Sequence, residues 1–252
     1  MEHAGNIAYP IYALDGTTNN ETLYAHELSH MWWGDLVTCR TPEDMWLNEG
    51  WASFCEAVFL ECLYGKSAYT KDIQSKLETV MLSAPKSDGA FYPISGVPHD
   101  ATYGTHVYKK GAVVAHTLRT MMGDSAFFVA CKYYLKAHQY GNASSEDLLQ
   151  YFQLYTPINL TDFFNNWVYN PGYEDIAIES YTVVDRKVNL TLSYQTRYHD
   201  WTTNEVPLTI DLISSNGNKQ RVQYNQVWGL TTKVINLDVS MSDVMYLSLI
   251  HI

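Results

Sequence analysis

The sequence predicts an α+β protein with two domains, a mostly helical one over residues 1–174 and an all-β one over residues 175–252. In the first domain, N-cap residues and helix-ending glycines mark out a series of helices. In the second, short apolar runs alternate with polar positions and are broken by turns such as 214–218. Several short strands at this spacing indicate a small β-sandwich.

Turn and capping residues bound the expected elements. A turn is expected at Asp15-Gly16, after two short strands, and Asn19 or Asn20 should cap a helix that ends near Gly34. The two strands are expected over 6–9 and 11–14, the later helices over 44–64, 66–82, 106–122, 124–137, 144–154 and 160–168, and a long loop over 84–104. The strands of the second domain are expected over 176–178, 181–184, 188–192, 206–212 and 233–237.

Composition excludes several classes of function. Hydrophobic residues make up 46% and charged residues 17% of the chain, as is typical of a globular protein. The net charge of −11 argues against a nucleic-acid partner, because phosphate binding requires a basic surface. No apolar run approaches the roughly 18 residues of a membrane-spanning helix, so no transmembrane segment is expected in this chain. The 4 cysteines lack the spacing of a metal site or a disulfide framework, and core packing is their expected role.

The sequence leaves the localisation open. Four Asn-x-Ser/Thr triplets, which begin at Asn20, Asn142, Asn159 and Asn189, fit the glycosylation pattern. Such triplets arise freely in Asn-rich chains. They therefore favour a secreted or cell-envelope protein over a cytoplasmic one only slightly.

The segment His26-Glu27-Leu28-Ser29-His30 carries the strongest functional signal. Residues four apart share one face of a helix, so His26 and His30 can direct imidazole nitrogens at a single metal ion. Glu27 is turned by about 100° from His26 and therefore lies beside the ion. There it would act as the general base that takes a proton from an attacking water. The pattern predicts a zinc hydrolase.

Glu49 supplies the third ligand of this predicted site. It lies in Asn48-Glu49-Gly50-Trp51-Ala52 on the next expected helix, with 18 residues between His30 and Glu49. Catalytic zinc takes three protein ligands and keeps a fourth position open, so His26, His30 and Glu49 predict one zinc ion per chain. A bare HExxH pattern also arises by chance on amphipathic helices. The apolar surroundings favour a metal, because an unpaired buried His or Glu is costly.

Taken together, the motifs resemble the zinc aminopeptidases of the gluzincin group, which includes the membrane alanyl aminopeptidases and the leukotriene-hydrolase type of peptidase. Met1-Glu2-His3 is similar to the Met-Glu-Asn of the family's exopeptidase loop, and residues 30–38 are similar to the stretch after its zinc signature. Residues 108–112 are similar to its Tyr-x-Lys-Gly-Ala, and residues 166–173 to the end of its catalytic domain. The resemblance covers roughly residues 1–175 and implies a thermolysin-like zinc peptidase fold for the first domain.

The resemblance implies two further site residues. Glu2 would bind the free α-amino group of the substrate, since a carboxylate is a natural partner for an ammonium, and cleavage would then be restricted to the N-terminus. Tyr108 would donate a hydrogen bond to the oxyanion of the tetrahedral intermediate. Tyr103, five residues upstream, is the alternative tyrosine. His3 stands where the family usually has Asn, which alters the hydrogen bonding of this loop to the substrate.

The family's N-terminal β domain, which helps to shape the amine pocket, and its large C-terminal helical domain have no counterpart in the sequence. The chain is therefore expected to be a fragment or a truncated form of a longer enzyme, with a truncated β domain. The zinc site should be complete and the substrate cleft incomplete. The missing N-terminal domain of the parent enzyme is then an expected partner.

The sequence thus predicts a zinc-dependent metallo-aminopeptidase that removes N-terminal residues from peptides. Two alternatives stay open. One is a related zinc endopeptidase, which would use the same metal and lack the amine anchor. The other is a catalytically inactive zinc-binding fragment or adhesion module.

Overall fold

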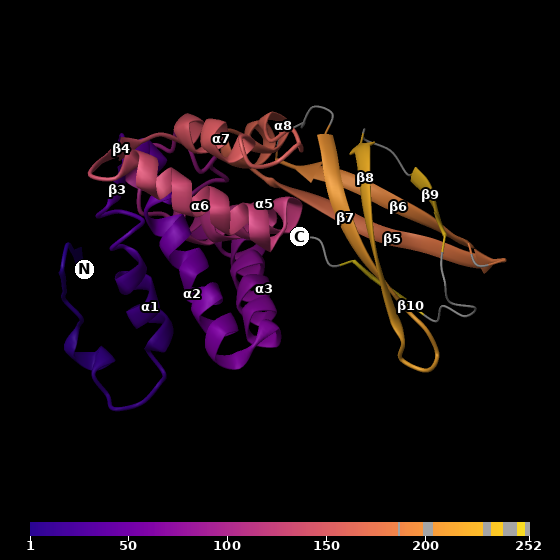
Figure 1. Ribbon diagram of the computed structural model, residues 1–252, viewed down its shortest axis with the longest axis horizontal. Coiled ribbons are helices and arrows are strands. Elements are labelled where there is room, and N and C mark those ends of the chain that lie inside the picture. The colour runs from indigo at the N-terminus through magenta and orange to yellow at the C-terminus, as the bar shows by residue number, and fades with distance from the viewer. Residues whose placement is uncertain (186, 199–203, 229–232, 239–245, 250–252) are drawn as a thin grey trace. The chain divides into compact units, whose positions relative to one another are not determined.

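The computed structural model describes residues 1–185, 187–198, 204–228, 233–238 and 246–249, and the chain divides into two compact units, Met1–Pro171 and Gly172–Ile252. The first unit is mostly helical, and the described part of the second consists of strands and their turns (Figure 1). This confirms the α+β class expected from the sequence. The division between the units falls three residues before the expected end of the first domain at residue 174.

The elements of the first unit, in which η marks short helices of 3-10 or π type, follow in chain order. They are β1 (Glu2–His3), β2 (Asn6–Ile7), η1 (Ile11–Ala13), α1 (Glu21–Ser29), β3 (Val37–Cys39), η2 (Pro42–Leu47), α2 (Glu49–Tyr64), α3 (Lys66–Leu82), α4 (Ala84–Ser87), η3 (His99–Ala101), η4 (His106–Lys110), α5 (Gly111–Met122), α6 (Asp124–His138), β4 (Gly141–Ala143), α7 (Ser145–Gln153), α8 (Thr161–Phe163) and η5 (Phe164–Val168).

Helix α2 lies at the centre of this unit, between α1 and α3, and also packs on α5 (Figure 1). Trp51, in the first turn of α2, is 1% exposed, and its ring stacks on that of Trp33 at a centroid distance of 4.0 Å. Phe127 and Phe152 add ring contacts to Trp51 at 5.8 and 5.7 Å. Replacing one buried aromatic ring of this kind by alanine typically lowers the free energy of unfolding by about 3–5 kcal/mol. The cluster therefore holds the start of α2 against the segment that follows α1.

Two of the sequence expectations near the first helix were wrong. Residues 11–14 do not form a strand; η1 turns back instead, with the Ala13 N–H donating to the Pro10 carbonyl at 2.9 Å. Helix α1 ends at Ser29 rather than near Gly34, and His30 is its C-cap. The segment from Met31 then makes a turn that Gly34 closes at φ 138°, a conformation that disfavours any other residue.

The second predicted helix also begins later than expected. A short helix, η2, opens at Pro42, but Asp44 leaves the helical conformation at φ −105° and ψ 22°, and α2 starts only at Glu49. The cause is tertiary, since the Asp44 carboxylate accepts hydrogen bonds from the hydroxyls of Ser95 and Ser145, both at 2.6 Å. These partners are distant in sequence, so local capping signals could not reveal the break.

The expected loop over 84–104 contains the short helices α4 and η3, and the remaining helices lie close to their expected positions. The segments expected over 66–82 and 124–137 correspond to α3 and α6, and the segment over 144–154 corresponds to α7. Ser144 caps α7 through a reciprocal pair of hydrogen bonds with Asp147. All four cysteines, Cys39, Cys55, Cys62 and Cys131, are free.

The described residues of the second unit form two three-stranded antiparallel sheets. One has the order β5 (Tyr173–Val184), β6 (Lys187–Arg197), β9 (Lys233–Asp238), and the other β10 (Tyr246–Leu249), β7 (Asn204–Ile213), β8 (Lys219–Trp228). Val188, Leu190 and Leu192 are buried at alternate positions of β6, so one face of this strand is apolar. Strands β8 and β10 were missed by the sequence analysis, whereas the predicted turn at 214–218 is present, closed by the Ser214 N–H and the Asn218 carbonyl at 3.0 Å.

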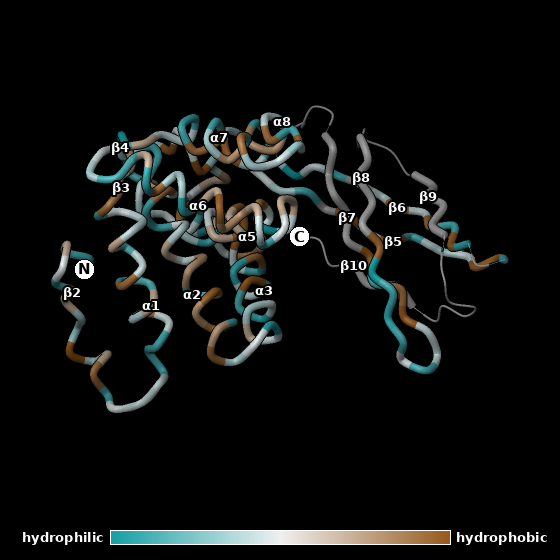
Figure 2. The backbone as a smooth tube through the Cα atoms, in the orientation of Figure 1, coloured by the Kyte–Doolittle hydropathy of each residue, from teal (hydrophilic) through white to brown (hydrophobic). Residues whose placement is uncertain are grey.

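Hydrophobic stretches on the described helices are short and interrupted (Figure 2). Within the part of the chain that the structure describes, no helix combines the length and the apolar character needed to cross a bilayer.

Candidate metal centre and active site

Two histidines face one another at the end of α1. His26 lies in its last turn and His30 caps it, so one helical turn separates them. Their rings meet edge to face with centroids 4.9 Å apart, and their Nε2 atoms lie 3.2 Å apart. Both side chains are buried, His26 at 8% and His30 at 1% exposure.

Glu49 completes a triangle of donor atoms with these histidines. Its Oε2 lies 3.1 Å from His26 Nε2 and 3.2 Å from His30 Nε2. Zinc ligands at about 2.0–2.2 Å in tetrahedral geometry lie roughly 3.3 Å from one another, close to the observed sides. The donor set and its spacing therefore fit a tetrahedral zinc ion with one position open.

The charges at this triangle also favour a cation. Burial alone would lower the pKa of His26, but hydrogen bonds to Glu49 and Glu56 outweigh burial and raise the pKa to about 9. Burial alone would raise the pKa of Glu49, but the two histidines outweigh it and lower the pKa to about 2. Without a metal, protons on the imidazoles balance these carboxylates. A divalent cation can take the place of those protons.

The outer nitrogen of His26 is held by a chain of side chains. Its Nδ1–H donates to Glu56 Oε1 at 2.8 Å, and Glu56 Oε2 lies 2.9 Å from Lys76 Nζ. Lys76 also pairs with Asp72 one turn earlier on α3. Since Nδ1 carries the proton in this hydrogen bond, the Nε2 lone pair of the neutral ring is directed at the metal position.

The outer nitrogen of His30 is held by the backbone. Its Nδ1–H donates to the Trp33 carbonyl at 2.8 Å. Gly34 permits this contact, because a Cβ at that position would lie 3.1 Å from His30 Nδ1. Asn48 fixes the neighbouring segment by accepting a hydrogen bond from the Cys39 N–H at 3.0 Å.

Glu27 and Glu2 lie beside the triangle. Each of Glu2, Glu27 and His30 has one possible metal-ligand atom, and these three atoms lie within 4.8 Å of one another. Glu27 Oε2 accepts no hydrogen bond from the described residues, and it forms an ion pair with the Met1 ammonium at 2.9 Å. This oxygen is therefore held by that ion pair and by no structural hydrogen bond. Glu2 is brought here by the pairing of β1 with β2, in which Glu2 is opposite Ile7.

Tyr108 is the tyrosine that the structure brings to the metal site. It lies on η4, and its ring is nearly parallel to that of His26, with centroids 6.0 Å apart. Burial and the negative charge of Glu49 raise the pKa of Tyr108 well above its usual value, so its hydroxyl stays protonated.

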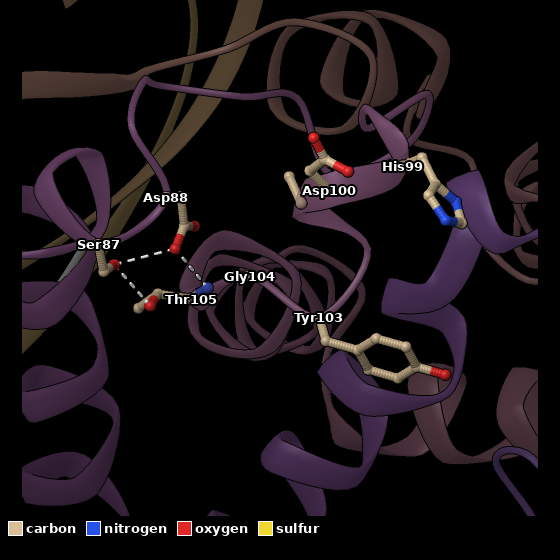
Figure 3. Close-up of a pocket in the computed structure, with 8 residues that line it drawn as sticks. Ser87, Asp88, His99, Asp100, Tyr103, Gly104 and Thr105 are labelled. Carbon is tan, nitrogen blue, oxygen red and sulfur yellow. Dashed lines mark hydrogen bonds between the residues drawn. The ribbon is translucent and has the colours of Figure 1, made fainter.

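Tyr103 is 67% exposed and lines a separate pocket of about 390 Å³ (Figure 3). The Asp88 carboxylate at this pocket accepts hydrogen bonds from the Ser87 hydroxyl and the Thr105 N–H, both at 2.9 Å. His106 donates to the same carboxylate at 2.6 Å and is buried, as expected for a core histidine.

Glu56 and Lys76 are the members of this site that the sequence analysis missed. Glu56 follows Glu49 by seven residues, which places it two helical turns along the same face of α2. Lys76 interrupts the buried stripe of α3 formed by Tyr69, Ile73 and Val80. A lysine in an otherwise apolar stripe signals a buried acidic partner, because an unpaired buried charge is costly.

The sequence matches a known family over most of the helical unit. A profile described as the peptidase family M1 domain matches residues 7–167. An aminopeptidase N of Lactococcus lactis subsp. cremoris is 32% identical over 163 residues, which are 63% of this chain and 19% of that protein. A thyrotropin-releasing hormone-degrading ectoenzyme of Mus musculus is 29% identical over 250 residues, which are 88% of this chain and 22% of that protein. The chain thus spans about a fifth of the length of these relatives.

Solved structures share the fold. Aminopeptidase A of Legionella pneumophila, in complex with aspartic acid, superimposes with a TM-score of 0.68 at 19% identity, over 87% of this chain and 24% of its own. An M1 zinc metallopeptidase of Deinococcus radiodurans, the E323A mutant bound to a Tyr-Ser-Ala substrate, superimposes with a TM-score of 0.54 at 24% identity, over 60% of this chain and 33% of its own.

Proposed function

The chain belongs to the peptidase M1 family, and on that premise we propose that its helical unit is the catalytic domain of a zinc-dependent aminopeptidase acting on peptides with a free N-terminus. The observation that carries the proposal is the buried triangle of His26, His30 and Glu49, with donor atoms 3.1–3.2 Å apart. His26, His30 and Glu49 would hold one zinc ion, which when bound supplies Lewis-acid chemistry at the scissile carbonyl.

Glu27 is the proposed general base and acid. Its carboxylate lies next to the proposed metal ligands, and its Oε2 accepts no hydrogen bond from the described residues and is held only by an ion pair with the Met1 ammonium, so it can take a proton from the attacking water. The same oxygen can then return the proton to the leaving amine. The Tyr108 hydroxyl, kept protonated by its raised pKa, would donate a hydrogen bond to the oxyanion.

Glu2 is the proposed anchor for the substrate ammonium. Its carboxylate and that of Glu27 belong to one cluster with His30, which concentrates negative charge beside the metal position. A peptide with a free amino group would gain a charge-assisted hydrogen bond there, whereas a blocked peptide would not. The finding that two relatives are named as an aminopeptidase N and a hormone-degrading ectoenzyme also supports peptide substrates.

The test is a metal measurement combined with hydrolysis of a panel of aminoacyl anilides. Glu27→Gln should retain zinc and lose at least about 100-fold in kcat, since general-base catalysis contributes about that much. Glu78→Gln, an exposed carboxylate on α3, should change neither. Unchanged turnover in the Glu27→Gln protein would remove the mechanism.

N-acetylated peptides separate the remaining possibilities. An aminopeptidase should refuse them, and Glu2→Gln should raise KM for free peptides. Cleavage of acetylated and free peptides at equal rates would instead indicate an endopeptidase. Complete zinc binding without hydrolysis of any peptide would indicate a non-catalytic zinc module.

A further inference from the structure

Two glycines touch where α2 crosses the junction of η4 and α5. Gly50 directly follows Glu49 at the start of α2, and Gly111 is the first residue of α5, three residues after Tyr108. A Cβ added to Gly50 would lie 2.8 Å from Gly111 Cα and 3.0 Å from the Val107 carbonyl oxygen. A Cβ added to Gly111 would lie 2.7 Å from Gly50 Cα.

Neither glycine is required by the local backbone conformation. Gly111 has φ −56° and ψ −44°, which is ordinary helix, and Gly50 lies inside α2 without a positive φ. Glycine is less favourable than alanine in a helix, so its presence at both positions calls for another reason. That reason is space, because the two backbones are in direct contact.

The crossing lies between two residues of the proposed active site. Glu49 precedes one glycine, and Tyr108 lies one helical turn before the other. At this point backbone meets backbone, so no side chain can yield to absorb a change in spacing. The distance between the two helices therefore determines how far the Tyr108 hydroxyl lies from the ligand set of Glu49 and the histidines.

We propose that Gly50 and Gly111 are positioning residues, which set the reach of the Tyr108 hydroxyl to the oxyanion. This inference rests on the proposed function, in which Tyr108 stabilises that charge. A methyl group at either position would push η4 away from α2. Zinc and the ground-state substrate would still bind, and the transition state would lose the tyrosine hydrogen bond.

The experiment is a double-mutant cycle between Gly111→Ala and Tyr108→Phe, with kcat, KM and the zinc dissociation constant measured for each protein. Gly111→Ala alone should lower kcat at least tenfold, with KM and zinc affinity within about twofold of wild type. In the Tyr108→Phe background the same change should cost less than twofold, because its effect passes through the tyrosine. Affinity for a phosphinic peptide, a tetrahedral transition-state mimic, should fall in parallel with kcat.

Two further variants separate positioning from general loss of stability. Gly50→Ala approaches the contact from the other helix and should reproduce the drop in kcat. Leu118→Ala, a fully buried position on α5, should lower the melting temperature at least as much without pushing the helices apart, and should keep kcat in the folded protein.

Each outcome decides between the claims. In one outcome the wild type is active and the losses in kcat caused by Gly111→Ala and Tyr108→Phe add up in the double variant. That result would overturn the positioning role and leave the proposed function intact. Alanine variants that stay unfolded even with excess zinc and sucrose would also overturn it, because the contact would then serve the fold as a whole. A wild type without hydrolysis would remove the proposed function, and the positioning role with it.

Discussion

His26 and His30 present the same nitrogen to the metal position but are held in different ways. His26 depends on side chains from two other helices, Glu56 on α2 and Lys76 on α3. His30 depends on the carbonyl of Trp33, three residues further along the chain, and Gly34 leaves room for this contact. Substitutions in the charged network at His26 can change the strength of that support by degrees. The support of His30 is a backbone contact, so a substitution there can only disrupt it.

Gly34→Ala should have the largest effect on zinc binding. It combines a strained φ of 138° with a Cβ 3.1 Å from His30 Nδ1. We expect the free energy of unfolding to fall by about 1–3 kcal/mol and zinc affinity to fall by about 100-fold. Urea unfolding and competition with a chelator measure these two quantities.

Gly123→Ala is the matched control for that variant. Gly123 has φ 75°, and a Cβ there would meet nothing within 4 Å. It should lose stability through backbone strain and keep its zinc affinity. An equal loss of zinc affinity in both variants would contradict the role given to the Trp33 carbonyl.

Zinc affinity should rise with pH throughout the range below about 9. Glu49 and Glu56 outweigh burial and raise the pKa of His26 to about 9, and only the neutral imidazole binds zinc. Displacing the His26 proton gives about a tenfold gain per pH unit, or about 100-fold between pH 6 and pH 8. The pKa of His30 is also raised, because its contacts with Glu49 outweigh burial, so a proton displaced from His30 adds to this gain. Chelator competition at several pH values measures this, and a flat profile would be inconsistent with the charged site described above.

The zinc-free protein should show the opposite trend in stability. Because the pKa of His26 is raised on folding, its contribution to stability is complete below the unfolded value of 6.5 and is lost as the pH rises through about 9. Urea unfolding with a chelator present follows this loss.

Glu56→Gln should weaken zinc binding by about tenfold, because it removes the charged partner that orients His26. Glu61→Gln on the same helix is the control. Glu61 forms an ion pair with Arg119 at a distance of 2.5 Å, and this pair does not involve the proposed metal ligands. That variant should lose stability and retain its zinc affinity. Equal zinc affinity of the two variants would show that Glu56 does not orient His26.

Lys76→Met should have the smallest effect on zinc, below that of Glu56→Gln. Loosening Glu56 weakens the site, whereas removing a nearby positive charge favours a cation, so the two consequences partly cancel. We expect a loss of about threefold, below the roughly 10- to 100-fold that is typical when a direct partner of a metal ligand is removed. Lys76→Arg should restore the wild-type value, and a gain in affinity in Lys76→Met would show that charge outweighs orientation.

Local sequence patterns predicted the parts of the site that one helix or one spacing defines. The four-residue interval between His26 and His30 requires only helical geometry, and the structure places their Nε2 atoms 3.2 Å apart. The helix expected over 66–82 coincides with α3, because residues next to its two ends in the sequence define where it begins and stops. The break at Asp44 was missed, because it is caused by hydrogen bonds from Ser95 and Ser145, which lie 51 and 101 positions further along the chain.

The sequence by itself brought out His26, His30 and Glu49 as the proposed metal ligands, Glu27 as the neighbouring carboxylate and the order of a helical domain before a β domain, because each depends on residues near one another in the chain. Only the tertiary structure decided that Tyr108 rather than Tyr103 faces the ligands, that Lys76 supports His26 through Glu56, and that Gly50 meets Gly111. The physical reason is that these contacts join separate helices, whose spacing follows from the packing of the whole unit and leaves no periodic pattern in the sequence.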